Sequence, residues 1–214
     1  MKWSKKMNKP FIIVNGVPHS YTSMISKFLI DNGAFTKELW DNPKWDFPYS
    51  RFEEKDMQEF VNARKKFKNY DLTSYFDSLP EDEVVMAKHP LSIFFINELD
   101  KFTDRKIKVV YIIRNPEQII LSSMDKGGKS FIYYFQRICW LHDFMVDCKF
   151  ELLPFIAERI KKDGKRLLDF CELSTEKIDY SSVRSMEKRK PTYLKYRFAN
   201  FFWKRLNKFF KVYK

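Results

Sequence analysis

The chain has 214 residues, of which 44% are hydrophobic and 18% aromatic, and its formal net charge is +12. This composition excludes a disordered chain, and the length suits a single domain with a sizeable core. The apolar runs are too short for a secretory signal or a membrane span, and the three cysteines, Cys139, Cys148 and Cys171, lack the C-x-x-C spacing of a metal or redox site. We therefore expect a cytoplasmic protein in a reducing compartment.

Three short apolar runs predict buried strands, and each is followed by a helical pattern. A fourth strand is expected in "KFELL", which follows Cys148. Strands that alternate with helices predict crossover connections and a parallel sheet, so the expected fold class is a three-layer α/β/α domain. The predicted strands are Phe11 to Asn15, Glu83 to Ala87 and Ile107 to Ile113, and the predicted helices are Met24 to Asn32, Leu91 to Phe102, Pro116 to Met124 and Ser130 to Cys148.

Two further stretches interrupt this alternation. An aromatic and charged insertion lies between Phe35 and Leu79, and within it Glu53 to Tyr70 has the pattern of an amphipathic helix. An insertion that follows the first strand and helix could cover a binding site. After the fourth strand, "FIAERIKKDGKRLLDFCEL" predicts two helical segments that are separated at Gly164.

The sequence that follows each of the first three strands contains a cationic or potentially cationic side chain. These exits read "NGVPHSYTS", "AKHP" and "RNP", and they supply His19, Lys88 and Arg114. In open α/β sheets, ligands bind beyond the carboxyl ends of the strands. The three side chains are therefore expected at one edge of the sheet, where they would favour an anion.

The third exit continues as a helix with a second polar group at a fixed spacing. Asn115 suits an N-cap and Pro116 suits the first helical position, so a helix is expected directly after Arg114. Ser122 comes about two turns after Asn115 and returns to the same face. Arg114 and Ser122 could therefore hold one phosphate together. The alternative is an arginine paired with a carboxylate and a serine buried on a helix.

A magnesium-dependent nucleotide enzyme is disfavoured by these exits. Its phosphate loop reads G-x-x-x-x-G-K-[ST], and an alignment on Gly16 puts Tyr21 at the second glycine and Thr22 at the lysine. None of these three predicted strands ends in the acidic residue that helps to hold magnesium. The loop is therefore expected to bind an anion without this metal.

These segments resemble the sulfotransferase family, whose members have a P-loop-like fold. "GVPHSYTS" resembles the 5′-phosphosulfate loop of the family, and "RNPEQIILS" resembles its 3′-phosphate motif, in which a serine follows an arginine by eight residues. "VVMAKHPLSIFFINEL" and "RLLDFCELS" are similar to two more segments of the family. The resemblance covers roughly residues 10 to 175, and the segments occur in the family's order.

The resemblance implies transfer of a sulfuryl group from 3′-phosphoadenosine-5′-phosphosulfate to a hydroxyl or amine of a carbohydrate or small molecule, without a metal. The 5′-phosphosulfate would bind to backbone N–H groups of the loop, from Ser20 to Ser23, and to the hydroxyls of Thr22 and Ser23. Arg114 and Ser122 would hold the 3′-phosphate. The implied donor-binding residues are Pro18, His19, Ser20, Tyr21, Thr22, Ser23, Arg114 and Ser122, and a partial match in "EKRKP" adds Arg189 and Lys190.

The resemblance also implies the catalytic groups. Transfer needs positive charge at the leaving phosphate oxygen and a base for the acceptor. His19 and Lys88 are the candidates for the first role, and Glu38 and His89 are the candidates for the base. Glu38 is preferred, because strand alternation would point Lys88 and His89 in opposite directions. The alternatives are structural: a helix cap for His19 and solvated surface positions for the others.

Two positions of the loop depart from the pattern of the family. His19 replaces lysine or arginine, although neighbouring anions would favour its charged form. Tyr21 replaces a glycine, the residue that permits φ > 0 and a close backbone approach. Either the loop avoids φ > 0 at Tyr21, or donor binding is weakened. In the second case the chain could retain the fold as a binding or membrane-associated protein with reduced catalysis.

The positive charge is concentrated after residue 183. Residues 184–214 hold 11 Lys/Arg and one acid, Glu187, whereas residues 1–183 hold 29 Lys/Arg and 27 Asp/Glu. We therefore divide the chain into a sulfotransferase-like domain, 1–183, and a basic amphipathic tail, 184–214. The aromatic residues of the tail follow helical spacing, which indicates contact with a membrane surface or a partner, or packing onto the domain. Nucleic-acid binding is not expected, because no recognition motif accompanies the charge.

Overall fold

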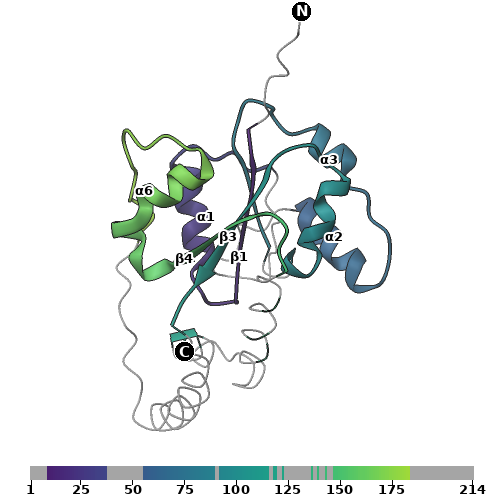
Figure 1. Ribbon diagram of the computed structural model, residues 1–214, viewed down its shortest axis with the longest axis horizontal. Coiled ribbons are helices and arrows are strands. Elements are labelled where there is room, and N and C mark those ends of the chain that lie inside the picture. Colours follow the sequence, from purple (N-terminus) through teal and green to yellow (C-terminus); the bar gives the residue numbers. More distant parts are fainter. Residues whose placement is uncertain are drawn as a thin grey trace, which may run out of the picture.

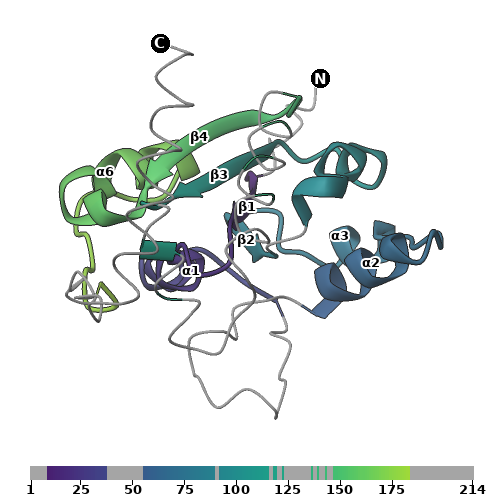
Figure 2. The same cartoon turned by 90° about the horizontal axis from the view of Figure 1, so that it is seen from below.

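A parallel four-stranded sheet forms the centre of the molecule. The computed structural model describes residues 9–37, 55–89, 92–115 and 147–183, together with positions 118, 119, 122, 136, 139 and 143. The strands lie in the order β2-β1-β3-β4, and each pairs with its neighbours in parallel (Figure 2). Their bounds are Phe11–Gly16 for β1, Val85–Lys88 for β2, Ile107–Ile113 for β3 and Glu151–Ile156 for β4.

The strands form where the apolar runs predicted them, because these residues are buried on both faces of the sheet. All residues of β1 and β2 are buried, and so are all residues of β3 except Ile113. The predicted parallel α/β sheet and the fourth strand are therefore confirmed. Strand β2 begins two residues later than expected and continues into Lys88, which places that lysine inside the sheet rather than after it.

Helices cover both faces of the sheet. Helices α1 and α6 lie on one side of the sheet, and α2 and α3 lie on the other (Figure 1). Side chains of α1 and α6 pack against Ile12 and Val14, and side chains of α2, α3 and η1 pack against Phe11 and Ile13. The bounds are Thr22–Asp31 for α1, Lys55–Lys65 for α2, Thr73–Asp77 for α3, Ser92–Lys101 for the 3₁₀ helix η1, Ala157–Arg159 for the 3₁₀ helix η2 and Ile160–Cys171 for α6.

The predicted break at Gly164 is wrong. Helix α6 runs through this glycine without interruption. A Cβ at Gly164 would lie 2.9 Å from the hydroxyl of Tyr180 and 3.3 Å from Cζ of Phe28. The glycine therefore allows the helix to approach these aromatic side chains closely, which is a tertiary reason that local sequence does not contain. The predicted helix from Leu91 to Phe102 is present as η1, and Gln118, Ile119 and Ser122 are helical as expected.

The order of the strands creates a switch point at β1. From β1 the chain passes α1, α2 and α3 and reaches β2 on one side, and it then crosses by way of η1 to β3 on the other side. Because α1 and η1 pack on opposite faces, the loop that leaves β1 lies where the direction of winding reverses. Ligands of open α/β sheets bind at such a point.

Gly16 lets the loop after β1 fold back onto the sheet. A Cβ at this position would lie 2.8 Å from Oγ of Ser20 and 2.9 Å from the carbonyl oxygen of Ile112. We expect Gly16→Ala to lower the free energy of unfolding by about 1–3 kcal/mol, because extra volume in a packed site displaces its neighbours. Urea denaturation at neutral pH measures this change. A loss below about 0.5 kcal/mol, the range of neutral surface substitutions, would contradict the close packing.

Candidate anion site

The loop after β1 delivers the amino end of α1 to the switch point. The first turn of α1 contains no Asp or Glu, and the N-cap residue, Tyr21, makes no side-chain capping bond within the described chain. The positive end of the helix dipole is therefore not neutralised by its own first turn. The N–H of Ser20 donates to the carbonyl oxygen of Val17 over 3.0 Å. That N–H closes the turn, and the predicted binding of the anion by the N–H groups of the loop stays a prediction.

Two residues of the loop have left-handed backbone conformations. The φ angle is 71° at His19 and 69° at Tyr21. The loop therefore does not avoid φ > 0 at Tyr21, and it keeps the conformation that a glycine would adopt most easily. A left-handed residue other than glycine costs about 1–2 kcal/mol, so other contacts must hold the loop in this shape.

Arg114 supplies those contacts. Its Nη1 donates to the carbonyl oxygen of His19 over 2.6 Å, and its Nη2 donates to the hydroxyl of Tyr21 over 2.9 Å. The guanidinium carbon lies 3.9 Å from the centre of the Tyr21 ring, a cation–π contact. Hydrogen bonds from a charged donor contribute about 1.5–3 kcal/mol each, which is enough to offset the strain of the loop. Arg114 is buried, with only 5% of its surface exposed.

Lys88 approaches the same loop from the opposite side. Its Nζ lies 3.1 Å from Oγ of Ser23, the second residue of α1, and the lysine is 3% exposed. Because β1 lies between β2 and β3, its exit loop receives one buried cation from each neighbouring strand. Lys88 and Arg114 therefore flank the amino end of α1, and the three positive groups together favour an anion.

His89 belongs to the other face of the sheet. Its Nε2 lies 2.8 Å from Oε1 of Gln58 on α2, whereas Lys88 contacts α1, so the expected opposite directions of Lys88 and His89 are confirmed. Burial, followed by the charges of Lys65 and Lys88, lowers the pKa of His89 from 6.5 to about 3. The imidazole is neutral and donates from Nε2 to the amide oxygen. A group with this pKa is a weak base, and the geometry does not favour His89 in that role.

Two polar residues at the strand exits escaped the sequence analysis. Asn15 ends the apolar run of β1, and its Nδ2 donates to the carbonyl oxygen of His89 over 2.9 Å and to Oγ of Ser92 over 3.1 Å. Its position as a polar residue at the end of a buried apolar strand could have identified Asn15 as a candidate from the sequence. Glu158 follows β4, and its carboxylate lies 3.6 Å from Nε of Arg114. Arg114 therefore pairs with a carboxylate, which was the alternative to phosphate binding in the sequence analysis.

The remaining candidates are only partly described by the structure. Ser122 is buried in a helical segment, and the N–H of Ile119 donates to the carbonyl oxygen of Asn115, so a helix does begin after Arg114 as expected. Glu38, Arg189 and Lys190 lie outside the described residues, as does the basic tail. Their predicted roles remain predictions.

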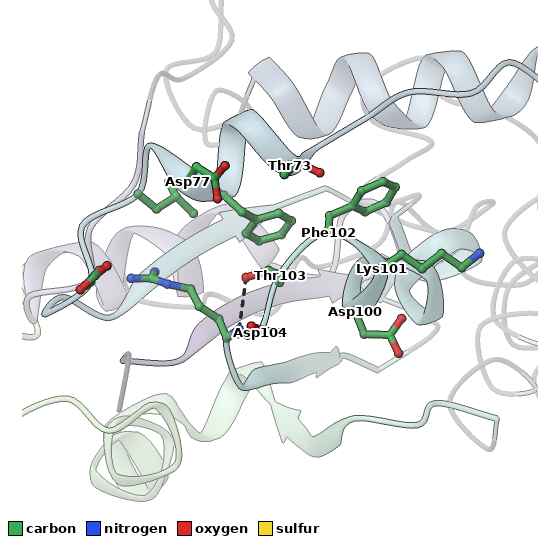
Figure 3. Close-up of a pocket in the computed structure, with 11 residues that line it drawn as sticks. Thr73, Asp77, Asp100, Lys101, Phe102, Thr103 and Asp104 are labelled. Carbon is green, nitrogen blue, oxygen red and sulfur yellow. Dashed lines mark hydrogen bonds between the residues drawn. The ribbon is translucent and has the colours of Figure 1, made fainter. Parts of the chain in front are cut away.

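An open pocket of about 390 Å³ lies near the amino ends of β2 and β3, opposite the anion site (Figure 3). It is formed by α3 and by the segment that leads from η1 into β3, where the N–H of Arg105 donates to Oγ1 of Thr103. These elements precede the amino ends of β2 and β3, whereas Lys88 and Arg114 lie at the carboxyl ends. The pocket is therefore separate from the anion site.

The buried neutral imidazole makes the stability of the fold depend on pH. The unfolded chain takes up a proton at His89 near pH 6.5, whereas the folded chain does so only near pH 3. The neutral His89 therefore contributes to the free energy of unfolding above pH 6.5, and this contribution is lost as the pH falls from 6.5 toward 3. We expect the wild type to lose about 2 kcal/mol more free energy of unfolding than His89→Gln between pH 7.5 and pH 5. Urea titrations at both pH values measure this difference, and equal losses would refute the neutral His89.

No protein-family model matches the sequence, and no curated protein matches it. Among solved structures, the chain is similar to the sulfotransferase domain of the olefin synthase from Synechococcus PCC 7002, with a TM-score of 0.56 and 12% identity over 91% of this chain and 85% of that chain. It also matches mouse sulfotransferase SULT7A1, which was crystallised with PAP, with a TM-score of 0.47 and 13% identity over 86% of this chain and 69% of that chain.

Within the part of the chain that the structure describes, no helix has the length and apolar character needed to span a bilayer. The parallel sheet, its helices on both faces and the similarity to the olefin synthase domain agree on one architecture. The chain therefore has a sulfotransferase-like α/β fold.

Proposed function

We propose that this chain is a sulfotransferase that uses 3′-phosphoadenosine-5′-phosphosulfate as donor and a hydroxyl or amine as acceptor, without a metal. The observation that carries the proposal is the position of two buried cations, Lys88 and Arg114, on either side of the loop that opens α1. The sulfotransferase-like fold supports the same assignment.

The residues present suit a donor with two separate anionic groups. The amino end of α1, with Thr22 and Ser23 in its first turn, would bind the 5′-phosphosulfate. Arg114 and Ser122 would hold the 3′-phosphate, and Arg189 and Lys190 are further candidates from the tail. Close packing at Gly16 supports this reading, because it keeps the loop against the strand end, where backbone groups can approach a ligand.

The donor would supply an activated sulfuryl group. During transfer, the bond from sulfur to the 5′-phosphate oxygen breaks, a bond from sulfur to the acceptor oxygen or nitrogen forms, and the acceptor loses a proton to a base. The ammonium of Lys88, held at Ser23, would stabilise the negative charge on the leaving phosphate oxygen. His19 lies in the same loop and is a second candidate for that role.

Glu38 remains the preferred base. His89 donates its Nε2 proton to Gln58, and its pKa of about 3 makes it a poor acceptor at neutral pH. After α1, Phe35 pairs in parallel with Val85 of β2, so the chain returns toward the carboxyl ends of the strands, and Glu38 follows three residues later. Glu38→Gln is the substitution that would remove this base with little change in size.

A second candidate function is nucleotide binding without transfer. The observation that favours it is Tyr21, a bulky residue in a left-handed conformation at the centre of the anion loop. In this case the chain would bind adenosine 3′,5′-bisphosphate, the product of the donor, but would not sulfate any acceptor. A screen for sulfuryl transfer to sugars, phenols, alcohols and amines separates the two candidates.

Binding of adenosine 3′,5′-bisphosphate tests the proposed donor site. We expect wild-type protein to bind it in calorimetry with EDTA present, and we expect Arg114→Ala to weaken binding by about 100-fold because a charged pair to phosphate is lost. Ser122→Ala should cost about tenfold, as for one hydrogen bond.

Arg159→Ala is the matched control, since this arginine is half-exposed and pairs with Asp163 on the surface of the domain. It should bind as the wild type does. Thermal melting of each variant separates lost contacts from lost folding. Absence of binding to the wild type, or a preference for ATP with magnesium, would overturn the proposed function.

A further inference from the structure

Tyr21 contacts Arg114 in two ways at once. The ring lies against the guanidinium, and the phenolic oxygen accepts a hydrogen bond from Nη2 over 2.9 Å. The carbonyl oxygen of His19 accepts from Nη1, and Glu158 lies beside Nε. Each nitrogen of the guanidinium therefore faces an oxygen atom of the protein itself.

The left-handed backbone conformation of Tyr21 is energetically unfavourable for a tyrosine. Its φ of 69° belongs to a region that glycine occupies readily and that bulky residues rarely adopt. The contacts with Arg114 offset this cost. The oxygen of Tyr21 lies on Arg114 as one oxygen of a phosphate would, at ordinary hydrogen-bond distance.

We propose that Tyr21 determines the nucleotide specificity of the donor site, because its hydroxyl competes with a 3′-phosphate for Nη2 of Arg114. This inference rests on the proposed function. A 3′-phosphate that takes the Nη2 hydrogen bond of Arg114 displaces the phenol from it, whereas a nucleotide with only a 5′-phosphate leaves that bond in place. The tyrosine therefore lowers the advantage of 3′-phosphorylated nucleotides over those that lack this group.

Tyr21→Phe keeps the ring on Arg114 and removes the competing oxygen. Calorimetry would give the affinities of wild type and variant for adenosine 3′,5′-bisphosphate and for adenosine 5′-monophosphate. The ratio of these affinities should rise about tenfold in the variant, which corresponds to one hydrogen bond to a charged group. Tyr70→Phe is the matched control, because its hydroxyl donates to Glu59 on α2, and it should leave the ratio unchanged.

The possible outcomes are distinct. A merely structural role for Tyr21 would change both affinities together and leave the ratio constant, which would overturn the inference but not the proposed function. A lower ratio would show that the phenol is a ligand of the 3′-phosphate, and it would also overturn the inference. If only the variant binds the bisphosphate, the inference is supported. If neither protein binds any nucleotide, the proposed function fails and this inference fails with it.

A second inference comes from the end of α2 and is independent of the donor site. The N–H of Lys68 donates to the carbonyl oxygen of Ala63, and the N–H of Phe67 donates to that of Arg64. These two bonds form a Schellman motif, in which the residue at the position of Phe67 is usually glycine. Phe67 has a φ of 55° and is 98% exposed.

Phe67 is thus unfavourable twice, through its backbone conformation and through its exposed ring. Exposed lysines surround it in the sequence at positions 65, 66 and 68. An aromatic side chain among lysines is complementary to a bilayer interface with anionic headgroups, where the ring leaves water and the lysines meet negative charge. We infer that this tip, residues 65–68, inserts into the surface of an anionic membrane.

Phe67→Gly separates membrane binding from folding. Glycine suits the left-handed position, so the variant should melt at a higher temperature than the wild type. In co-sedimentation of the full chain with phosphatidylcholine vesicles that contain phosphatidylserine, the bound fraction should nevertheless fall, with an affinity about fivefold lower. Vesicles of phosphatidylcholine alone should bind both proteins weakly.

Glu172→Gly is the control, since Glu172 has a φ of 60° at the end of α6 and its loss removes a negative charge, which cannot weaken binding to anionic vesicles. Undiminished vesicle binding by Phe67→Gly, or no binding by the wild type, would overturn this inference. So would wild-type binding that is equal on both kinds of vesicle. If Phe67→Gly weakens binding to an acidic polypeptide and not to vesicles, the tip is a protein-binding surface and the inference is wrong.

Discussion

The arrangement of the anion site depends on the contacts between the guanidinium of Arg114 and the loop that follows β1. The guanidinium joins the exit of β3 to this loop, through a carbonyl oxygen, a hydroxyl and an aromatic ring. The loop has two left-handed residues without a glycine, His19 and Tyr21, and a loop of this kind needs an external support to keep its shape. A buried charge in turn needs oxygen atoms around it, so the loop and the arginine stabilise each other.

The topology explains why two cations reach one loop. Strand β1 lies between β2 and β3, and parallel strands end at the same edge of the sheet. Residues at the carboxyl ends of β2 and β3 therefore flank whatever follows β1. The same alternation sends Lys88 to α1 and His89 to α2, although the two residues are adjacent in the sequence. A single register shift would exchange them, and the anion site would then receive a neutral imidazole instead of an ammonium.

The sequence predicted the strands because continuous apolar runs have few alternatives to a buried parallel sheet. It also predicted that His19 follows β1 and Arg114 follows β3, whereas Lys88 is the last residue of β2 and not part of its exit. It did not predict Gln58 as the partner of His89, Glu158 beside Arg114, or the uninterrupted helix at Gly164. Each of these depends on residues far away in the chain, whose distance is set by tertiary packing and not by local pattern. The left-handed Tyr21 belongs to the same class, because Arg114 stabilises a conformation that tyrosine alone would disfavour.

This chain and the olefin synthase domain share the architecture at 12% sequence identity. The fold therefore does not depend on most of the individual residues. In this chain the fold rests on apolar strands, on close packing at Gly16 and on the support that Arg114 gives the loop. The residues that stabilise the loop conformation can also differ in chemical type. Where a glycine would adopt the loop conformation without strain, this chain uses a tyrosine that is held by the arginine expected to bind phosphate. Under the proposed function, Arg114 both stabilises the loop and binds the 3′-phosphate. These two tasks oppose each other, because every contact that Arg114 makes with the loop must be shared with, or surrendered to, an incoming anion.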